Sequence, residues 1–385
     1  MEFALTAEQR EIRALARDVA AAEIAPRAAE WDRAHGFPRE LLSRLGELGL
    51  MGVCVPEEYG GAGSDFLSYA LVLEELSRAD AGVGVTVAVH TSACTLPLLG
   101  FGTPEQRERF VPPLARGEAI GCFALTEPAA GSDAGSMVSS AERVEGGWHV
   151  RAAKQWITNA AFGGTILLFV RTDPQTRSAR GVSAFVVDTD DVTITRTEEK
   201  LGLNSSVTND IAVDAVLPAD RLLGDEHHGF RIAMATLDGG RIGIAAQALG
   251  IAQAAYDVAL RYAQEREAFG RRISEFQAIQ HKLVDMSTEI DAARLLVYRA
   301  AWLKDRGESV TEAGAKAKLY ASEMARRQTA EAIQVLGGYG YTKEFPVERY
   351  YRDAKITEIY EGTSEIQRLV IAREILGRQH GAPAV

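Results

Sequence analysis

Cysteine is scarce in this 385-residue sequence, and basic residues do not outnumber acidic ones. The three cysteines, Cys54, Cys94 and Cys122, lie far apart and form no Cys-x-x-Cys pair, which argues against a disulfide framework or a zinc knuckle and favours a reducing compartment. Lys and Arg number 42 against 53 Asp and Glu, which gives a net charge of −11 without a clustered basic excess. We therefore expect no nucleic-acid surface, because phosphate binding requires such a cluster.

The sequence also has no recognisable targeting segment. Residues 1–5 lack the basic and apolar regions of a signal peptide and are too acidic for a transit peptide, so we expect a mature cytoplasmic protein. One stretch, residues 81–104, contains no Asp, Glu, Lys or Arg and is long enough to cross a bilayer. Its Gly, Thr, Ser and His residues make it much less apolar than a membrane span. We expect a helix buried on all sides and no membrane insertion.

Several common catalytic and nucleotide-binding motifs are absent. The stretches 61–63 and 338–340 each lack the third glycine of Gly-x-Gly-x-x-Gly, which disfavours a Rossmann site. No phosphate-binding loop with a Gly-Lys-Ser/Thr ending occurs, and Ser132 lacks the flanking glycines of a nucleophile elbow. His227 and His228 are adjacent and would point to different faces of a regular element. We interpret them as a solvated loop and predict no metal site.

Apolar periodicity divides the chain into three parts. The first part is helical, and Thr6-Ala7-Glu8-Gln9 has the spacing of a capping box, which predicts a helix from about residue 7. Short β-rich runs follow without helix-length patterns between them, at residues 148–150, 165–171, 182–187, 192–197 and 211–217. From about residue 230 the helical period returns, including a long amphipathic helix over 279–297. We predict a multidomain α+β protein with helical, all-β and helix-bundle domains over residues 1–120, 121–228 and 229–385.

Two glycine-containing polar regions are the candidates for chemistry. The first joins residues 123–133 to residues 154–160. Backbone N–H groups next to glycine, together with Thr and Ser hydroxyls, can bind the edge of a planar heterocycle and a pyrophosphate, and a Trp beside a Thr can cover an aromatic ring. A strand-to-turn connection with a packed core tryptophan explains the same residues equally well.

The second region joins residues 334–340 to residues 359–368. Thr363 or Ser364 suits the N-cap of a helix, because apolar periodicity begins just after them. Glu361 would then lie on the loop that leads into this helix. Burial would raise the pKa of its carboxyl toward that of a useful base, whereas the helix N-terminus favours the charged form, so the sequence does not fix the direction of the shift. A solvated loop glutamate is the alternative.

Taken together, residues 123–136, 156–158, 334–353 and 359–368 resemble the signature segments of the acyl-CoA dehydrogenase family of flavoproteins. The similarity runs from about Leu5 to the C-terminus. It is strongest to the short-chain and short/branched-chain members, through residues 236–245 and 361–367. The resemblance implies an N-terminal helical domain, a central β-barrel and a C-terminal four-helix bundle, with FAD between barrel and bundle in a homotetramer.

The resemblance also implies roles for individual residues. Those that would contact the flavin and its phosphates are Phe123, Leu125, Thr126, Gly131, Ser132, Trp156, Ile157 and Thr158. Those that would reach the adenine end of a neighbouring subunit's FAD are Arg266, Phe269, Gln277, Gln334, Val335, Gly337 and Gly338, with Thr363 and Glu365 completing the site. Those that would contact the substrate are Ser132, Leu237, Asp238, Arg241, Tyr360 and Gly362.

The implied reaction is the FAD-dependent oxidation of a short-chain acyl-CoA, straight or methyl-branched, to the trans-2-enoyl-CoA. Glu361 would remove the α-proton while the β-hydrogen leaves as hydride to flavin N5, and its backbone N–H would help to polarise the thioester carbonyl. Some relatives carry the base near residues 238–241, where this sequence has Gly239 and Gly240, so Glu361 is the remaining candidate.

The resemblance implies that the electrons pass to an electron-transferring flavoprotein. Two alternatives stay open. One is a biosynthetic enzyme that acts on an acyl group tethered to a carrier protein, and the other is a non-catalytic FAD-binding scaffold.

Overall fold

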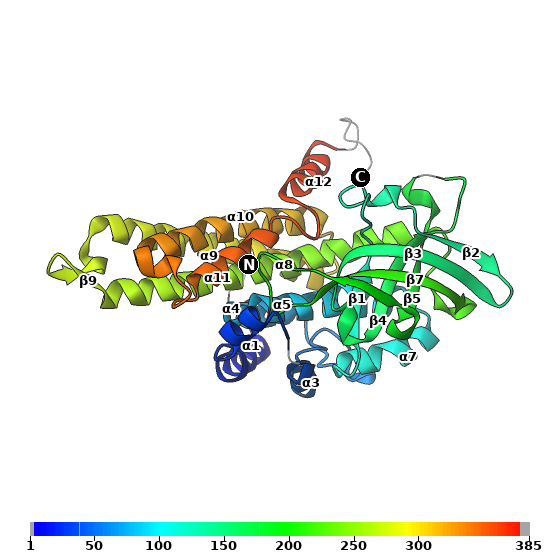
Figure 1. Ribbon diagram of the computed structural model, residues 1–385, viewed down its shortest axis with the longest axis horizontal. Helices are drawn as coiled ribbons and strands as arrows, with labels where there is room; N and C mark the ends of the chain where they lie inside the picture. Colours follow the sequence, from blue (N-terminus) through cyan, green and yellow to red (C-terminus); the bar gives the residue numbers. More distant parts are fainter. Residues whose placement is uncertain (1–3, 38, 177, 378–385) are drawn as a thin grey trace.

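The computed structural model describes residues 4–37, 39–176 and 178–377 (Figure 1). Residues 1–3 and 378–385, at the ends of the two expected helical domains, lie outside this range, so the interpretation of the N-terminus as free of a targeting segment is not addressed by the structure. The first part of the chain is helical, with π-helical turns at Ala20–Ile24 and Val89–Thr95. Its α-helices are α1 (Ala7–Val19), α2 (Ala28–Ala34), α3 (Arg39–Glu47), α4 (Phe66–Ala79), α5 (Ala81–Ala88), α6 (Leu96–Phe101) and α7 (Pro104–Ala115).

The capping box and the buried apolar helix are both confirmed. Thr6 Oγ1 accepts a hydrogen bond from Gln9 N at 3.1 Å, and Gln9 Oε1 accepts one from Thr6 N at 2.9 Å. The uncharged stretch forms a continuous helical run over Ala81–Phe101, long and apolar enough to cross a membrane, but 89% of its most apolar window is buried inside the protein. Its apolar side chains pack on neighbouring elements of this fold, so they serve as core.

The central part is an eight-stranded β-sheet in the order β6-β7-β3-β2-β4-β5-β8, with β1 parallel to β4. Four of the five predicted β-rich runs lie within strands, and the fifth, 192–197, begins one residue before its strand. Side chains from most strands converge on one apolar core, in which the Trp148 and Phe185 rings lie 5.4 Å apart. The strands are β1 (Ile120–Ala124), β2 (Ser140–Val144), β3 (Gly147–Thr158), β4 (Gly164–Arg171), β5 (Val182–Asp188), β6 (Thr193–Thr197), β7 (Thr208–Pro218) and β8 (Leu222–Leu223).

Long helices form the C-terminal part and lie side by side along the longest axis of the molecule (Figure 1). The sheet lies near one end of these helices, and the short hairpin of β9 and β10 lies at the other. At about 1.5 Å per residue, the 37 residues of α8 span roughly 55 Å. The elements are α8 (Gly229–Glu265), β9 (Glu267–Ala268), β10 (Arg271–Arg272), α9 (Gln277–Asp305), α10 (Thr311–Leu336), α11 (Val347–Ile356) and α12 (Ser364–Leu376).

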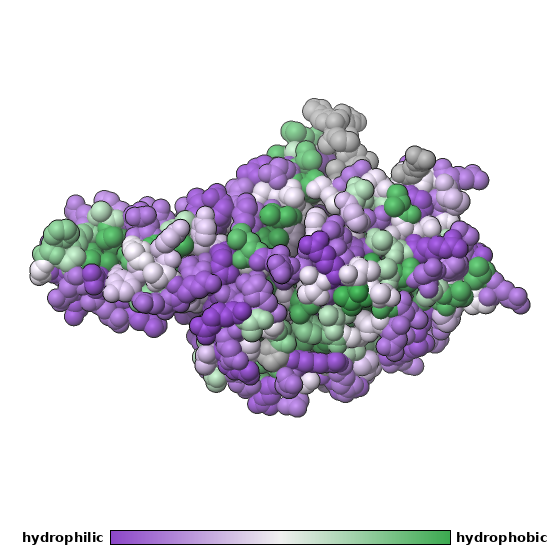
Figure 2. All heavy atoms as spheres, in the orientation of Figure 1, coloured by the Kyte–Doolittle hydropathy of each residue, from purple (hydrophilic) through white to green (hydrophobic). Residues whose placement is uncertain are grey.

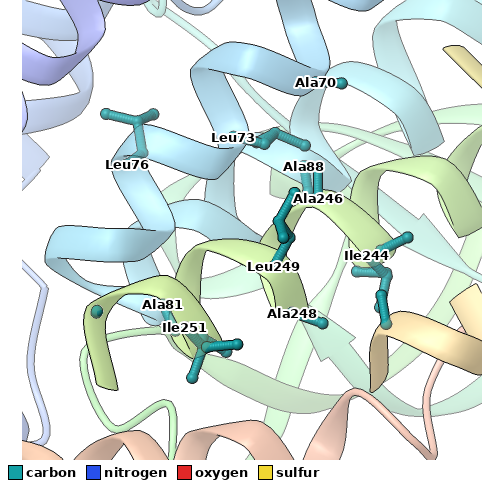
Figure 3. Packing of buried hydrophobic residues seen from close by; sticks show 14 of the residues in the cluster. Ala70, Leu73, Leu76, Ala81, Ala88, Ile244, Ala246, Ala248, Leu249 and Ile251 are labelled. Carbon is teal, nitrogen blue, oxygen red and sulfur yellow. The ribbon is translucent and has the colours of Figure 1, made fainter. Parts of the chain in front are cut away.

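The largest apolar core joins the N-terminal helices to this bundle. In Figure 3, Leu73 of α4 lies close to Leu249 of α8, within a cluster of buried residues that extends into α5. Small residues allow the helices to approach closely, since a Cβ at Gly250 would lie 3.0 Å from the backbone nitrogen of Arg78. The helical, β and helical parts thus agree with the predicted fold class.

Candidate active site

Glu361 lies on a tight turn between α11 and α12. Both Glu361 (φ 51°) and Gly362 (φ 92°) adopt the left-handed backbone region, which is uncommon for a residue with a side chain and is concentrated at functional sites. The Thr363 side chain accepts a hydrogen bond from Ile366 N at 3.3 Å and is the N-cap of α12. Of the two N-cap candidates in the sequence, Thr363 is therefore correct, and the turn is fixed at its helical end.

The carboxyl group of Glu361 lies directly against the backbone of Gly240 on α8. A Cβ at Gly240 would lie only 2.7 Å from Glu361 Cδ and 3.0 Å from Oε1, and closer still to Oε2. Real Cβ contacts essentially never fall below 3.0 Å, so only glycine fits here while the carboxylate keeps this position. The space over Gly240 is thus filled by a carboxylate from another element.

The Glu361 side chain is half-buried, and within the described residues no hydrogen bond reaches its carboxylate. Its Oε2 atom has no hydrogen-bond partner within the described part of the chain. Burial raises the pKa of Glu361 to about 7, and the nearby positive charges of Lys318 and Arg241 oppose this rise. The direction that the sequence left open is therefore upward, because desolvation outweighs the charges that favour ionisation.

Arg241 and Asp238 form a pair one turn apart on α8. Arg241 Nη1 contacts Asp238 Oδ1 at 2.6 Å, and Asp238 Oδ2 accepts a hydrogen bond from Thr311 Oγ1 at 2.7 Å. The guanidinium is buried and its Nε has no partner among the described residues. Burial lowers the pKa of Arg241, whereas Asp238 and Glu361 act to raise it. Arg241 therefore keeps an unused N–H donor, its Nε, near the Glu361 carboxylate.

The other predicted substrate residues are only partly brought together. Tyr360 precedes Glu361, and its hydroxyl donates to Gln247 Oε1, while Gln247 Nε2 donates to Ala81 O at 2.8 Å. Leu237 is half-buried on α8 next to Asp238. Ser132 is exposed on the loop between β1 and β2, and no hydrogen bond joins it to the Glu361 turn within the described residues. The expected substrate residues of the turn and of α8 therefore form one cluster, whereas Ser132 lies on a loop of the β domain.

The two polar segments of the β domain meet at the end of β1. Gln155 N donates to Thr126 O at 2.9 Å, and Lys154 Nζ donates to Leu125 O at 3.0 Å. Lys154 also pairs with Glu127 Oε1 at 2.8 Å, and both side chains are buried. Burial lowers the pKa of Lys154 to about 8, and the Glu127 carboxylate opposes this. A buried ion pair thus fixes the backbone of the segment that carries Leu125 and Thr126.

Trp156 lies at an irregularity in β3. The pairing of β3 with β7 shifts register between Lys154 and Ile157. Trp156 has φ 61°, and its backbone N–H donates to Asp210 Oδ1 at 3.2 Å. Its side chain is 57% exposed, whereas Ile157 is buried and Thr158 half-buried. Trp156 is therefore not a packed core tryptophan. A bulge with a bulky residue at positive φ and an outward-facing ring is a feature concentrated at functional sites.

The remaining residues expected around the flavin differ in exposure. Phe123 is half-buried, with its ring 4.9 Å from that of Phe169. Gly131 is exposed, and a Cβ placed on it would meet nothing within 4 Å. The open space at Gly131 and the exposed ring of Trp156 fit a large planar cofactor with a phosphate-bearing tail.

The residues expected at the adenine end lie far from the sheet. Arg266 follows α8 and lies 5.9 Å from the Tyr339 ring, and Phe269, at φ 52°, is 96% exposed on the adjoining hairpin. Figure 2 shows hydrophobic residues at the surface of this end of the molecule. Gln277, Gln334, Gly337 and Gly338 are exposed, and Val335 is buried. Because α8 spans roughly 55 Å, one dinucleotide cannot contact both groups within one chain.

Sequence reasoning missed two buried polar side chains at the Glu361 turn. Lys318 Nζ donates to Gly362 O at 2.7 Å, and Gln367 Nε2 donates to the same oxygen at 2.8 Å. The available signal was spacing: Lys318 falls on the apolar stripe of α10 that includes Gly314, Ala321 and Ala325, all of them buried. Glu365, by contrast, is exposed on the first turn of α12.

The chain matches family models over nearly its whole length. The matches are to the N-terminal domain of acyl-CoA dehydrogenase over residues 6–118, the middle domain over residues 122–216 and the C-terminal domain over residues 227–376. Fold and sequence therefore define a flavin-dependent oxidoreductase of acyl-CoA thioesters. The chain belongs to the acyl-CoA dehydrogenase family, whose cofactor is FAD.

Individual relatives cover almost the full chain. The short-chain specific acyl-CoA dehydrogenase of Bos taurus mitochondria is 50% identical over 95% of this chain and 89% of its own length. The butyryl-CoA dehydrogenase of Megasphaera elsdenii is 43% identical, with a TM-score of 0.96 over 98% of this chain and 100% of that chain. A chain in the structure of the electron transferring flavoprotein of Acidaminococcus fermentans is 45% identical, with a TM-score of 0.96 over 98% and 100%. These similarities support acyl-CoA dehydrogenation as the activity.

Proposed function

We propose that this chain oxidises short-chain acyl-CoA esters, straight or methyl-branched, to trans-2-enoyl-CoA with Glu361 as the base. The observation that carries the proposal is the Glu361 carboxyl group, which lies against Gly240 with Oε2 buried and free of any partner in the described chain. A carboxylate in this state is poised to accept a proton from a weak carbon acid. The relatives named as short-chain and butyryl-CoA dehydrogenases support the substrate class.

Glu361 and two neighbouring basic side chains have different roles in the proposed proton abstraction. Glu361 Oε2 takes the α-proton, and its pKa of about 7 keeps a large ionised fraction at neutral pH while leaving it basic enough to react. Lys318 and Arg241 supply the positive charge that favours ionisation before the transfer. No hydrogen bond from the N–H of Glu361 is found within the described residues, so this donor is free to polarise the thioester carbonyl.

The cofactor would be held by the residues around the bulge in β3. FAD, when bound, supplies the acceptor for the hydride that leaves the β-carbon. Trp156 and Thr158 would cover the ring, and Gly131 and Ser132 would approach the phosphates, which their exposure allows. The other proposed contacts are Phe123, Leu125, Thr126, Ile157, Thr363 and Glu365. The substrate would be held by Leu237, Asp238, Arg241, Tyr360 and Gly362, together with Ser132.

A neighbouring subunit would complete the cofactor site. The group of Arg266, Phe269, Gln277 and residues 334–338 is separated from Trp156 by most of the length of α8, and we propose that it reaches the adenine of a neighbour's FAD in a homotetramer. We further propose domain boundaries at residues 120/121 and 228/229. The electrons would pass to an electron-transferring flavoprotein, which the similarity to the Acidaminococcus fermentans chain supports.

Bleaching of the flavin tests the proposed base. The FAD-loaded protein is mixed anaerobically with butyryl-CoA, and loss of the oxidised-flavin absorbance is followed. Glu361→Gln should bind the thioester but leave the flavin oxidised, because the amide cannot accept the proton. Glu374→Gln makes the same chemical change on an exposed residue of α12 and should bleach at the wild-type rate. Unaltered bleaching by Glu361→Gln rejects Glu361 as the base.

The same assay separates the competing substrates. Butyryl-CoA is compared with the butyryl group on an acyl carrier protein, and the panel then extends to isobutyryl, 2-methylbutyryl, isovaleryl and straight thioesters of up to eight carbons. Strong preference for the carrier thioester would contradict the proposal in favour of a biosynthetic enzyme. Wild-type protein that is yellow but bleaches with no acyl thioester would be a scaffold.

A further inference from the structure

Lys318 is a fully buried lysine in the helix next to the Glu361 turn. It lies on the interior stripe of α10, where Gly314, Ala321 and Ala325 are also buried. Lysine is rarely buried unless its charge has a partner, because removing an ammonium group from water is costly. A small aliphatic residue would continue the stripe without this cost, so the ammonium group must contribute something that packing does not.

The ammonium group holds the backbone of the turn. Lys318 Nζ donates to Gly362 O at 2.7 Å, and Gln367 Nε2 donates to the same oxygen at 2.8 Å and to Glu361 O at 3.2 Å. A carbonyl oxygen has two lone pairs, and here two buried donors from different helices occupy them. Both residues of the turn have positive φ, so this conformation persists only if its surroundings fix it. Lys318 supplies one of these fixed points.

Most charges around Lys318 already have partners. Glu358 is paired with Arg326 at 2.8 Å and with Lys355 at 2.5 Å, and Glu365 is exposed to solvent. The remaining negative charge near Lys318 is the Glu361 carboxylate, whose Oε2 has no partner in the described chain.

The groups that face Glu361 come from several elements. They are Lys318 from α10 and Arg241 from α8, with the phenols of Tyr69 from α4 and Tyr360 on the turn itself. Burial raises the pKa of both phenols well above 10, so they are neutral. Arg241 is shared with Asp238, as its 2.6 Å contact shows. Burial lowers the pKa of Lys318 to about 7, and the Glu361 carboxylate opposes this fall, so the positive charge of Lys318 near neutral pH depends on Glu361. Lys318 has no other close carboxylate that is not already paired.

We propose that Lys318 is a positioning residue for proton abstraction, which holds the Glu361 turn through the Gly362 carbonyl and supplies positive charge to the carboxylate. This rests on the proposed function, in which Glu361 is the base. Loss of the ammonium group releases one of the two donors on Gly362 O and lets the turn move. It also removes a charge that favours the ionised base.

Lys318→Met tests the proposal by anaerobic flavin reduction with butyryl-CoA across a range of pH. We expect the rate of reduction to fall at least about tenfold, since small displacements of a base are costly. We also expect the pH midpoint of the rate to move upward, because the carboxylate loses a neighbour that favours its charged form. A purely structural role of Lys318 would not move this midpoint. Lys316→Met, on the same helix but paired with Glu312 at the surface, should behave as wild type.

Lys318→Gln provides the second variant, because it removes the charge but keeps a polar side chain. It should show the same upward shift of the midpoint, with FAD content and melting temperature measured alongside. Wild-type rate and midpoint in a folded, FAD-loaded Lys318→Met or Lys318→Gln protein would overturn the proposal, and so would failure of both variants to fold. Bleaching by Glu361→Gln would instead reject the base itself, whatever the Lys318 variants do.

Discussion

Replacing Gly240 by alanine should lower the rate of flavin reduction about 100-fold without weakening the fold. The added Cβ would lie 2.7 Å from Glu361 Cδ, whereas ordinary contacts lie at 3.4–4 Å. The difference of 0.7–1.3 Å means that the carboxyl group must move by about 1 Å. It can do so because it is the end of a flexible side chain. Misplacement of a catalytic group by 1 Å can cost about 100-fold in rate, or about 2.7 kcal/mol of activation free energy.

The free energy of unfolding of this variant should not fall, although its rate does. Gly240 lies in the interior of α8, where alanine is favoured over glycine by roughly 0.5–1 kcal/mol. Gly240→Ala should therefore keep or slightly raise the free energy of unfolding. Flavin reduction by butyryl-CoA under single-turnover conditions measures the rate, and urea denaturation measures the stability.

Gly239→Ala is the matched control on the neighbouring residue. A Cβ at Gly239 would lie 3.4 Å from Lys304 Nζ and 3.9 Å from the Phe66 ring, which are ordinary contacts. This variant should reduce the flavin at nearly the wild-type rate. If Gly240→Ala also kept the wild-type rate, the argument that the Glu361 carboxylate must remain against this glycine would be refuted.

Three further outcomes are expected. The rate of flavin reduction should rise with pH through a midpoint near 7, because burial raises the pKa of Glu361 and only the ionised form accepts a proton; a midpoint near the ordinary value of 4.5 would contradict the burial argument. Trp156→Ala should change the unfolding free energy of the FAD-free protein by less than about 0.5 kcal/mol, since the ring is largely exposed, yet weaken FAD binding in a fluorescence titration; unchanged affinity would remove Trp156 from the cofactor site. Glu127→Gln should lower the unfolding free energy by about 3 kcal/mol in urea because it strands the buried Lys154 ammonium, and a loss below about 1 kcal/mol would show that the pair is not buried as described.

The sequence predicted those elements whose signals are local. The capping box at Thr6 and Gln9 specifies a helix start through contacts three residues apart, and the structure confirms it. The β-rich runs were recognisable by composition, but β1 and β2 were not. β1 directly follows the helical part as a short apolar run, and β2 is mostly polar because several of its side chains are exposed. Strand identity there comes from pairing with β4 and β3.

At the candidate site, too, the features with local sequence signals could be predicted and those that depend on distant elements could not. Glu361 could be placed on a turn before a helix because Thr363 and the periodicity that follows it are local signals. The direction of its pKa shift could not be predicted, because burial against Gly240 and the charge of Lys318 come from helices that are distant in sequence. The exposure of Trp156 was equally hidden, since it depends on the register shift between β3 and β7.

The continuous course of α8 has a consequence for mixed assemblies. About 39 Å of unbroken helix separates Gly240, beside the base, from Arg266, at the proposed nucleotide end. If each cofactor site combines the base of one subunit with the distal hairpin of another, a subunit that lacks the base can still provide an intact hairpin to its neighbour. A subunit with an altered hairpin can likewise provide an intact base. Co-assembled Glu361→Gln and Arg266→Ala chains would then regain activity that neither parent has, as in intersubunit complementation.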